Sequence, residues 1–196
     1  MLLSGDLKPG SILQERRLAS ILEVSRTPLR GALGQLAVKG LVTRQAGRFA
    51  TLDALNIQRL VEAFNLRRIL EAEFAALAAR RLPATRFEVI RASSLALNKQ
   101  SKITSADYWR VDNAFHAAIA EAAGNEFAAS LGLDVRRQTH VFIIPRDLDE
   151  VQQGFHEHLA ILDAVMSGDA ALSRELMSDH IANEKAAALS KALSES

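Results

Sequence analysis

The sequence predicts a mainly α-helical protein in two parts, an N-terminal winged helix-turn-helix and an all-α six-helix bundle. Two observations predict this fold class. Residues 1–52 contain two short helical patterns followed by two short β-type runs. From residue 56 onward, apolar residues recur at helical spacing and strand signals are absent. We therefore expect a head over 1–52, a linker over 53–55 and a helical domain over 56–196.

The first helix of the predicted pair lies in "LQERRLASIL", after a turn signal at Lys8-Pro9-Gly10. Its spacing places Leu18, Ala19 and Leu22 on one side. In the next segment, "VSRTPLRGALGQLAVKG", a hydroxyl of Ser25 or Thr27 is suited to cap a second helix, and proline is tolerated in its first turn. This helix should end at a glycine, Gly40.

The second helix should have one apolar and one polar face. The inward positions at helical spacing are Leu29, Ala32, Leu33, Leu36 and Ala37. The positions left facing outward are Arg26, Thr27, Arg30 and Gln35. After this helix, "LVTR" and "FATL" predict a two-stranded wing whose turn holds Gly47 and the basic Arg48. A recognition helix enters the major groove by its N-terminus, so the polar cluster there is placed for phosphates and base edges. An ordinary capped surface helix would show the same local pattern.

Charge is distributed unevenly between the two parts. Residues 1–52 carry eight Lys or Arg and three acids, a net charge of +5, which leaves −4 for the remainder because the whole chain is +1. A basic module joined to an acidic one is typical of nucleic-acid binders with a regulatory domain. The chain has no cysteine, which excludes disulfides and thiolate metal sites. It has neither a membrane-spanning apolar run nor a signal-peptide pattern, so we expect a cytoplasmic protein with no membrane partner.

The head resembles the DNA-binding domain of GntR-family bacterial transcription regulators over residues 5–52. The shared motifs are P-G, E-R-x-L-A, V-S-R-T-P-L-R, A-L-x-x-L, G-L-V and the glycine-bearing wing, all in order. The resemblance implies contacts to double-stranded operator DNA from Arg16, Arg26, Thr27, Arg30 and Gly47. We add Ser25, which lies at the start of the second helix, and Arg48, which lies in the wing turn. Three features depart from the family pattern: most of the first helix is expected to be missing, Glu23 stands where a glycine is usual, and Gly31 replaces a glutamate.

The six helices of the bundle are separated by Pro83, Gly124-Asn125, Pro145 and Gly168. Their expected ranges are 56–81, 84–99, 105–123, 126–143, 148–167 and 169–192. In the first of them, the apolar pattern consists of Ile57, Leu60, Val61, Phe64, Ile69, Leu70, Phe74 and Leu77.

Four polar residues of the bundle fall on faces that should turn inward. Asp112 and His116 are four apart, so they share a helical face. His158 shares a face with Ile161, Leu162 and Val165, His156 points elsewhere, and His180 is close to Leu176 and Met177. One carboxylate and three imidazoles have the composition of a divalent metal site. Any one of these histidines, taken singly, could instead be a hydrogen-bonded core residue.

The bundle resembles the FadR C-terminal (FCD) effector domain of the same regulator family. The ordered pattern is D-x-x-F/x-H, then E-H-x-x-I-x-x-A, then H-I. The resemblance implies that Asp112, His116, His158 and His180 hold a divalent cation, with zinc, nickel and manganese as candidates. It also implies that Arg67 faces a bound carboxylate, with Arg137 or its neighbour Arg136 as a second cation; Arg67 could equally be a surface salt-bridge partner.

Taken together, these features predict a metabolite-responsive transcription regulator, a repressor and not an enzyme. It would act as a homodimer whose helical domain binds a small carboxylate effector and shifts the heads on a palindromic operator. Two alternatives stay open at this point. One is a metal-dependent hydrolase built on the bundle, although no base or nucleophile stands out beside the four ligands. The other is a degenerate regulator with weakened DNA binding.

Overall fold

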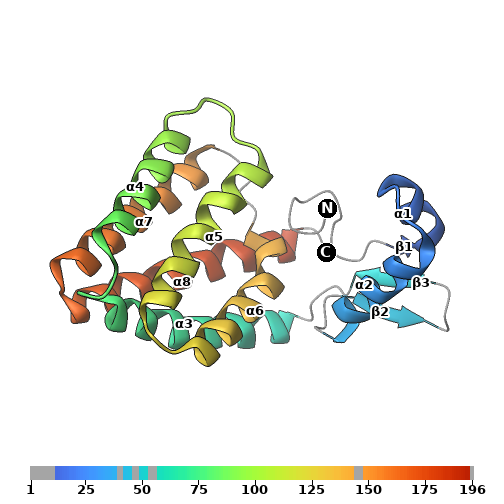
Figure 1. The fold of residues 1–196 in the computed structure, drawn as a ribbon, viewed down its shortest axis with the longest axis horizontal. Coiled ribbons are helices and arrows are strands. Elements are labelled where there is room, and N and C mark those ends of the chain that lie inside the picture. Colours follow the sequence, from blue (N-terminus) through green and yellow to red (C-terminus); the bar gives the residue numbers. More distant parts are fainter. Residues whose placement is uncertain (1–11, 39–41, 46–48, 53–56, 144–147, 195–196) are drawn as a thin grey trace.

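Two folded parts make up the chain, and both have the predicted class (Figure 1). The computed structural model describes residues 12–38, 42–45, 49–52, 57–143 and 148–194. The predicted linker, 53–55, and two predicted DNA contacts, Gly47 and Arg48, lie outside the described residues.

The head is a winged helix-turn-helix. Its elements are β1 (Ile12–Gln14), α1 (Glu15–Ile21), α2 (Arg26–Val38), β2 (Val42–Gln45) and β3 (Phe49–Leu52). The strands form one antiparallel sheet in the order β1-β3-β2. The predicted wing hairpin is therefore confirmed as β2 and β3. A small core holds the sheet to both helices and consists of Leu13, Leu18, Ala19, Leu29, Leu33 and Val42.

The sequence does not predict strand β1, because Ile12–Gln14 lies between the turn signal and the first helical pattern. Its backbone pairs with β3, with Ile12 opposite Thr51 and Gln14 opposite Phe49. Leu13 is buried between two exposed neighbours, which is the alternation of a half-buried strand. Three residues are too few for a period of two to be separated from a helical pattern.

The turn between α1 and α2 shows why a glycine is usual at the position of Glu23. Glu23 has φ +52°, in the left-handed region where glycine is favoured. Two residues of the expected apolar sides are not buried: Leu22, just past the end of α1, is 45% exposed, and Ala32 on α2, expected to face inward, is also exposed. Both lie at the edge of the apolar faces of these helices, which are narrower than the sequence pattern indicated.

The bundle contains the six predicted helices, each within three residues of its expected ends. They are α3 (Ile57–Ala78), α4 (Ala84–Asn98), α5 (Ser105–Ala122), α6 (Glu126–Ile143), α7 (Leu148–Ser167) and α8 (Ala170–Ser194). Helix α3 packs along α8 and also contacts α5 and α6, while α7 packs on α8 and α4 (Figure 1). Ile69 is not part of the core: it is 69% exposed and lies about 140° around α3 from the buried Phe64, at about 100° per residue.

Apolar side chains from α3, α5, α7 and α8 form the centre of the bundle, among them Phe64, Phe115, Ile161, Leu162 and Met177. Against this core, α5, α7 and α8 each place a histidine that is at most 3% exposed. Buried imidazoles require polar partners, and these partners define the candidate site. Within the described ranges, no helix is long and apolar enough to cross a membrane.

Candidate functional site

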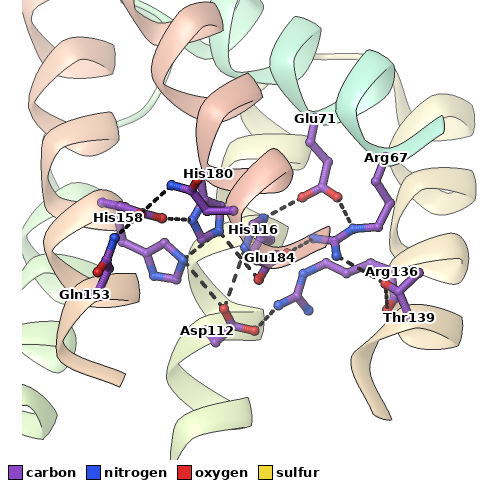
Figure 2. A network of polar contacts seen from close by, with 12 residues as sticks. Arg67, Glu71, Asp112, His116, Arg136, Thr139, Gln153, His158, His180 and Glu184 are labelled. Carbon is purple, nitrogen blue, oxygen red and sulfur yellow. Dashed lines mark hydrogen bonds and ion pairs between the residues drawn. The ribbon is translucent and has the colours of Figure 1, made fainter. Parts of the chain in front are cut away.

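A buried network of charged and polar side chains lies between five helices of the bundle (Figure 2). Its members come from α3 (Arg67, Glu71), α5 (Asp112, His116), α6 (Arg136, Thr139), α7 (His158) and α8 (His180, Glu184). The sequence prediction named Asp112, His116, His158 and His180, and the structure brings all four together.

Ligand atoms of the four residues lie close to one another at one point of the site: nitrogens of the three histidines are within 4.8 Å of one another, and Asp112 lies beside His116 and His158. The Nε2 atom of His158 lies 3.2 Å from His180 Nε2 and 3.6 Å from Asp112 Oδ1. The Nε2 atom of His116 also lies 3.6 Å from Asp112 Oδ1. Ligands bound to one metal ion at about 2.0–2.2 Å lie about 3–3.6 Å from each other. The spacing therefore suits one small divalent cation.

The chemistry of the donor atoms fits a cation as well. Among the residues that the structure describes, Asp112 Oδ1 and His116 Nε2 are buried and have no hydrogen-bond partner. An unpaired buried polar atom costs on the order of 1–3 kcal/mol. A metal ion at the common point would satisfy both atoms at once, because each offers a lone pair to it.

Two histidines are held from behind by carboxylates. The Nδ1 atom of His116 lies 2.5 Å from Glu71 Oε2, and that of His180 lies 2.7 Å from Glu157 Oε2. The contact of His180 is a hydrogen bond, which favours the proton on Nδ1 and leaves Nε2 to bind a metal, whereas that of His116 is an ion-pair contact. The ring of His158 is positioned differently, by stacking on Phe115 with the ring centroids 3.9 Å apart.

Burial and charge act on these groups in different directions. Burial lowers the pKa of His116 and of His158 well below the usual value, which keeps both neutral and suited to metal binding. Burial also disfavours the charged form of His180, but the carboxylates of Glu184 and Glu157 outweigh it and raise its pKa. Burial raises the pKa of Asp112 to about 6, against the opposing effect of Arg136.

Arg67 is fully buried and each of its guanidinium nitrogens has a partner. Nε lies 2.6 Å from Glu71 Oε1, Nη1 donates to Thr139 Oγ1 at 3.1 Å, and Nη2 lies 2.8 Å from Glu184 Oε2. The expectation of a surface salt bridge is therefore wrong. The expected partner of Arg67 is the carboxylate of a bound ligand. In the structure, Arg67 faces a carboxylate of the chain, that of Glu184.

The two neighbouring arginines of α6 differ in position. Arg136 is buried, where it pairs with Asp112, and its guanidinium lies 4.6 Å from the centre of the Trp109 ring. Arg137, the predicted effector residue, has a side chain 44% exposed and pairs with Asp134 at 2.6 Å. Arg137 lies outside the buried network, so Arg136 is the α6 arginine at the site.

Three carboxylates at the site were missed from the sequence: Glu71, Glu184 and Glu157. A signal existed for the first two, since Glu71 follows Arg67 by four positions and Glu184 follows His180 by four, which places each pair on one helical face. Glu157 lies one position before His158 and reaches across to α8, which no spacing along the chain indicates.

A cavity of about 280 Å³ adjoins the network on the α7 and α8 side. Its lining includes Tyr108, Gln153, Glu157, His180, Asn183 and Glu184. Two residues of the network line this cavity: His180, which is buried, and Glu184, whose carboxylate oxygens are buried. A small molecule in this cavity would lie against the candidate metal position.

The second candidate surface lies on the head. Helix α2 begins at Arg26, so Ser25 directly precedes it, and Ser25, Arg26, Thr27 and Arg30 are all exposed at its N-terminal end. Arg16 on α1 is exposed too. The side chain of Arg30 is 47% exposed, and its Nε lies 3.5 Å from Glu15 Oε2. A helix N-terminus with exposed arginines and hydroxyls is suited to phosphate and base contacts.

Comparison with known proteins supports both parts of this arrangement. The model for bacterial regulatory proteins of the gntR family matches residues 1–51, and the FCD domain model matches residues 62–183. The HTH-type transcriptional regulator LutR of Bacillus subtilis (strain 168) is 28% identical over 208 aligned positions, covering 93% of this chain and 94% of the relative.

Two further proteins are similar over most of the chain. The Uxu operon transcriptional regulator of Escherichia coli (strain K12) is 30% identical, and the alignment covers 90% of this chain and 78% of the relative. The solved structure of E. coli McbR/YncC has the same fold, with a TM-score of 0.85 and 21% identity, over 96% of this chain and 92% of that one.

Proposed function

Because the chain belongs to the gntR family of bacterial regulatory proteins and carries an FCD domain, we propose that it is a DNA-binding repressor controlled by a metabolite. The observation that carries this proposal is the head surface defined above. A winged helix presents the N-terminal end of α2, with Arg26, Thr27 and Arg30 exposed, as a recognition helix requires. Such a regulator would act in the bacterial cytoplasm, where the chromosome lies.

In this proposal, the bundle holds one divalent cation through Asp112, His116, His158 and His180. The support is the convergence of their ligand atoms and the two buried atoms without hydrogen-bond partners. Three imidazoles and one carboxylate suit zinc, nickel or manganese. Bound there, the cation would offer an open coordination position to a ligand in the adjoining cavity.

The effector in this proposal is a small organic acid. A carboxylate can bind a metal ion while it pairs with a guanidinium, and Arg67 and Arg136 lie beside the proposed ligands. Effector binding changes operator affinity only if the acid binds the DNA-competent and DNA-incompetent arrangements with different free energies.

We also infer that the regulator acts as a homodimer. A two-fold symmetric dimer places two heads on the half-sites of a palindromic operator. The bundle carries exposed apolar side chains that a partner could cover. The two most exposed of the large ones in the described part of the chain are Phe127 on α6, at 83%, and Ile69 on α3, at 69%.

The experiment that tests this function is selection of DNA from a random pool by the metal-loaded protein. The expected result is a palindromic sequence with two half-sites, bound by the wild type with strong dependence on salt. Recovery of unrelated sequences, bound no more tightly than bulk DNA, would contradict the proposal.

A further inference from the structure

The position of Glu184 is the part of the network that the four-ligand metal site leaves unexplained. Its Oε2 lies 2.8 Å from Nη2 of Arg67, while its Oε1 lies 3.6 Å from Nε2 of His180. A ligand atom of Glu184 also lies within 4.8 Å of those of Asp112 and His116. One carboxylate therefore extends from the guanidinium of Arg67 to the point where the histidine nitrogens converge (Figure 2).

Neither oxygen of Glu184 makes a hydrogen bond within the described part of the chain, although both are buried. Arg67 supplies charge compensation to Oε2 through the ion pair, whereas Oε1 faces Nε2 of His180 at 3.6 Å. A buried carboxylate oxygen without a donor is costly unless a cation binds it. The geometry of Glu184 is that of a carboxylate shared between an arginine and a metal ion.

The contacts of Arg67 point the same way. Its Nε lies on Glu71, its Nη1 donates to Thr139 and its Nη2 lies on Glu184, so each guanidinium nitrogen already has a partner. An effector carboxylate can therefore pair with Arg67 at this point only by replacing that of Glu184.

We propose that Glu184 is an internal carboxylate ligand, which occupies the position of the effector's carboxylate between Arg67 and the metal ion and must be displaced when the effector binds. This inference rests on the proposed function, because it requires the metal site. Glu184 would then determine the specificity for acids, because an acid binds by replacing the carboxylate of Glu184.

The surroundings of Glu184 allow such an exchange. Glu184 lines the cavity of about 280 Å³, together with polar side chains such as Gln153 and Asn183 that could receive its carboxylate after displacement. Such a site binds ligand only after the internal group has moved away. Its apparent affinity is the intrinsic affinity multiplied by the fraction of molecules in the open state. The intrinsic affinity for acids would thus be masked in the wild type.

The test compares wild type with Glu184→Gln, both loaded with Co²⁺, in titrations with acetate and succinate. The amide keeps the size of the side chain but loses the charge and most of the affinity for metal. We expect acid to bind Glu184→Gln about tenfold more tightly than wild type, since the open fraction rises. The Co²⁺ absorption spectrum should also differ between the two proteins before acid is added, because one anionic ligand is lost.

Glu157→Gln is the matched control. Glu157 lines the same cavity and carries the same charge, but it contacts Nδ1 of His180 from behind and does not pair with Arg67. At saturating Co²⁺ this variant should not bind acid more tightly than wild type. An equal gain in Glu157→Gln would overturn the proposal, because the cause would then be the charge of the cavity and not ligand exchange.

Two other outcomes separate this inference from the proposed function. If wild type binds Co²⁺ but Glu184→Gln has the same spectrum and equal, weaker or no acid binding, the role of Glu184 is wrong while the metal site stands. If wild type takes up no Co²⁺, both the metal site and the inference fail.

Discussion

At the scale of single residues, the proposed metal site depends on which face of α7 turns inward. His158 is fully buried and its Nε2 meets His180 and Asp112, whereas His156, two positions earlier, is exposed. Two residues apart on a helix differ by about 200° around the axis. The chain thus contains two histidines on one helix, of which only one should bind the metal.

We expect His158→Ala to lose most of its bound metal and to melt at a lower temperature than wild type. One of four ligands is lost, and bound metal stabilises the folded state by mass action. His156→Ala should keep the metal and the melting temperature of wild type. Metal analysis of the purified proteins, with melting curves before and after a chelator, checks both. Full metal content in His158→Ala would show that the site is elsewhere.

Metal binding should depend on pH through His180. Its pKa in the metal-free protein is raised by Glu184 and Glu157 against the effect of burial, so it holds a proton that a metal ion must displace. The apparent affinity should therefore rise with pH by about tenfold per unit until the pKa of His180 is passed, and then level off. Below a pH of about 6, protonation of Asp112 should make the dependence steeper.

Titration calorimetry in buffers of different ionisation enthalpy counts the protons released. The expected release approaches one proton per metal ion as the pH falls below the pKa of His180. A release of zero at every pH would mean that His180 is neutral before the metal binds.

The burial of Asp112, His116, His158 and His180 could be predicted from sequence because each lies among apolar residues at helical spacing, and apolar neighbours indicate an inward face. Arg136 could not be separated from Arg137 in the same way. The two are adjacent, and what distinguishes them is the contact of Arg136 with Asp112 and Trp109 on α5. Contacts between helices determine which of the two side chains is buried, and these contacts cannot be read from a single sequence.

At the scale of the elements, the end of α7 depends on a glycine. Gly168 has φ +78°, and an added Cβ would overlap the side chain of Arg80. We expect Gly168→Ala to lower the free energy of unfolding by about 1–2 kcal/mol, the cost of a left-handed conformation for a residue with a Cβ. Urea unfolding measures this.

Gly154→Ala provides the control on the same helix. Gly154 is inside α7 with no positive φ, and an added Cβ would lie 3.6 Å from the Tyr108 hydroxyl, an ordinary contact. Alanine should stabilise the helix interior by roughly 0.5–1 kcal/mol. Equal changes in the free energy of unfolding for the two substitutions would show that the left-handed backbone at position 168 does not require glycine.

Helix α2 should carry the sequence specificity of the head. Arg30 is half exposed and pairs weakly with Glu15, so it can exchange that partner for DNA. Arg30→Ala should weaken binding to the selected operator by about 1–3 kcal/mol if Arg30 reads a base. Arg86→Ala, an exposed arginine of α4 paired with Glu121, removes the same charge from the bundle and should leave operator affinity unchanged. Equal operator affinity of wild type and Arg30→Ala, measured by mobility shift, would remove Arg30 from the interface.

The helices could be predicted well because each is long enough to repeat its apolar pattern several times and is closed by proline or glycine. Strand β1 could not, since it has three residues and is defined by its pairing with β3, some 37 positions away. Ile69 shows the same limit inside a helix: it fits an apolar pattern, but no helix of the bundle covers it.

At the scale of the whole molecule, the proposed regulator has a ligand site in the bundle and a DNA-binding surface on the head. The two sites lie on separate folded parts, α2 in the winged helix and the histidine cluster between α3, α5, α6, α7 and α8 (Figure 1). A regulator requires that occupation of one site changes the affinity of the other. Coupling free energies of this kind are typically about 1–3 kcal/mol, or about 5- to 150-fold in affinity.

The most direct test is operator affinity, measured by fluorescence anisotropy, with and without an acid that stabilises the metal-loaded protein in a thermal-shift screen. The acid should weaken operator binding by the metal-loaded wild type at least about fivefold. It should have no effect on chelated wild type or on His158→Ala, because its binding site is then incomplete. Operator affinity that is indifferent to the acid in the metal-loaded wild type, or equally sensitive with the metal removed, would contradict the account.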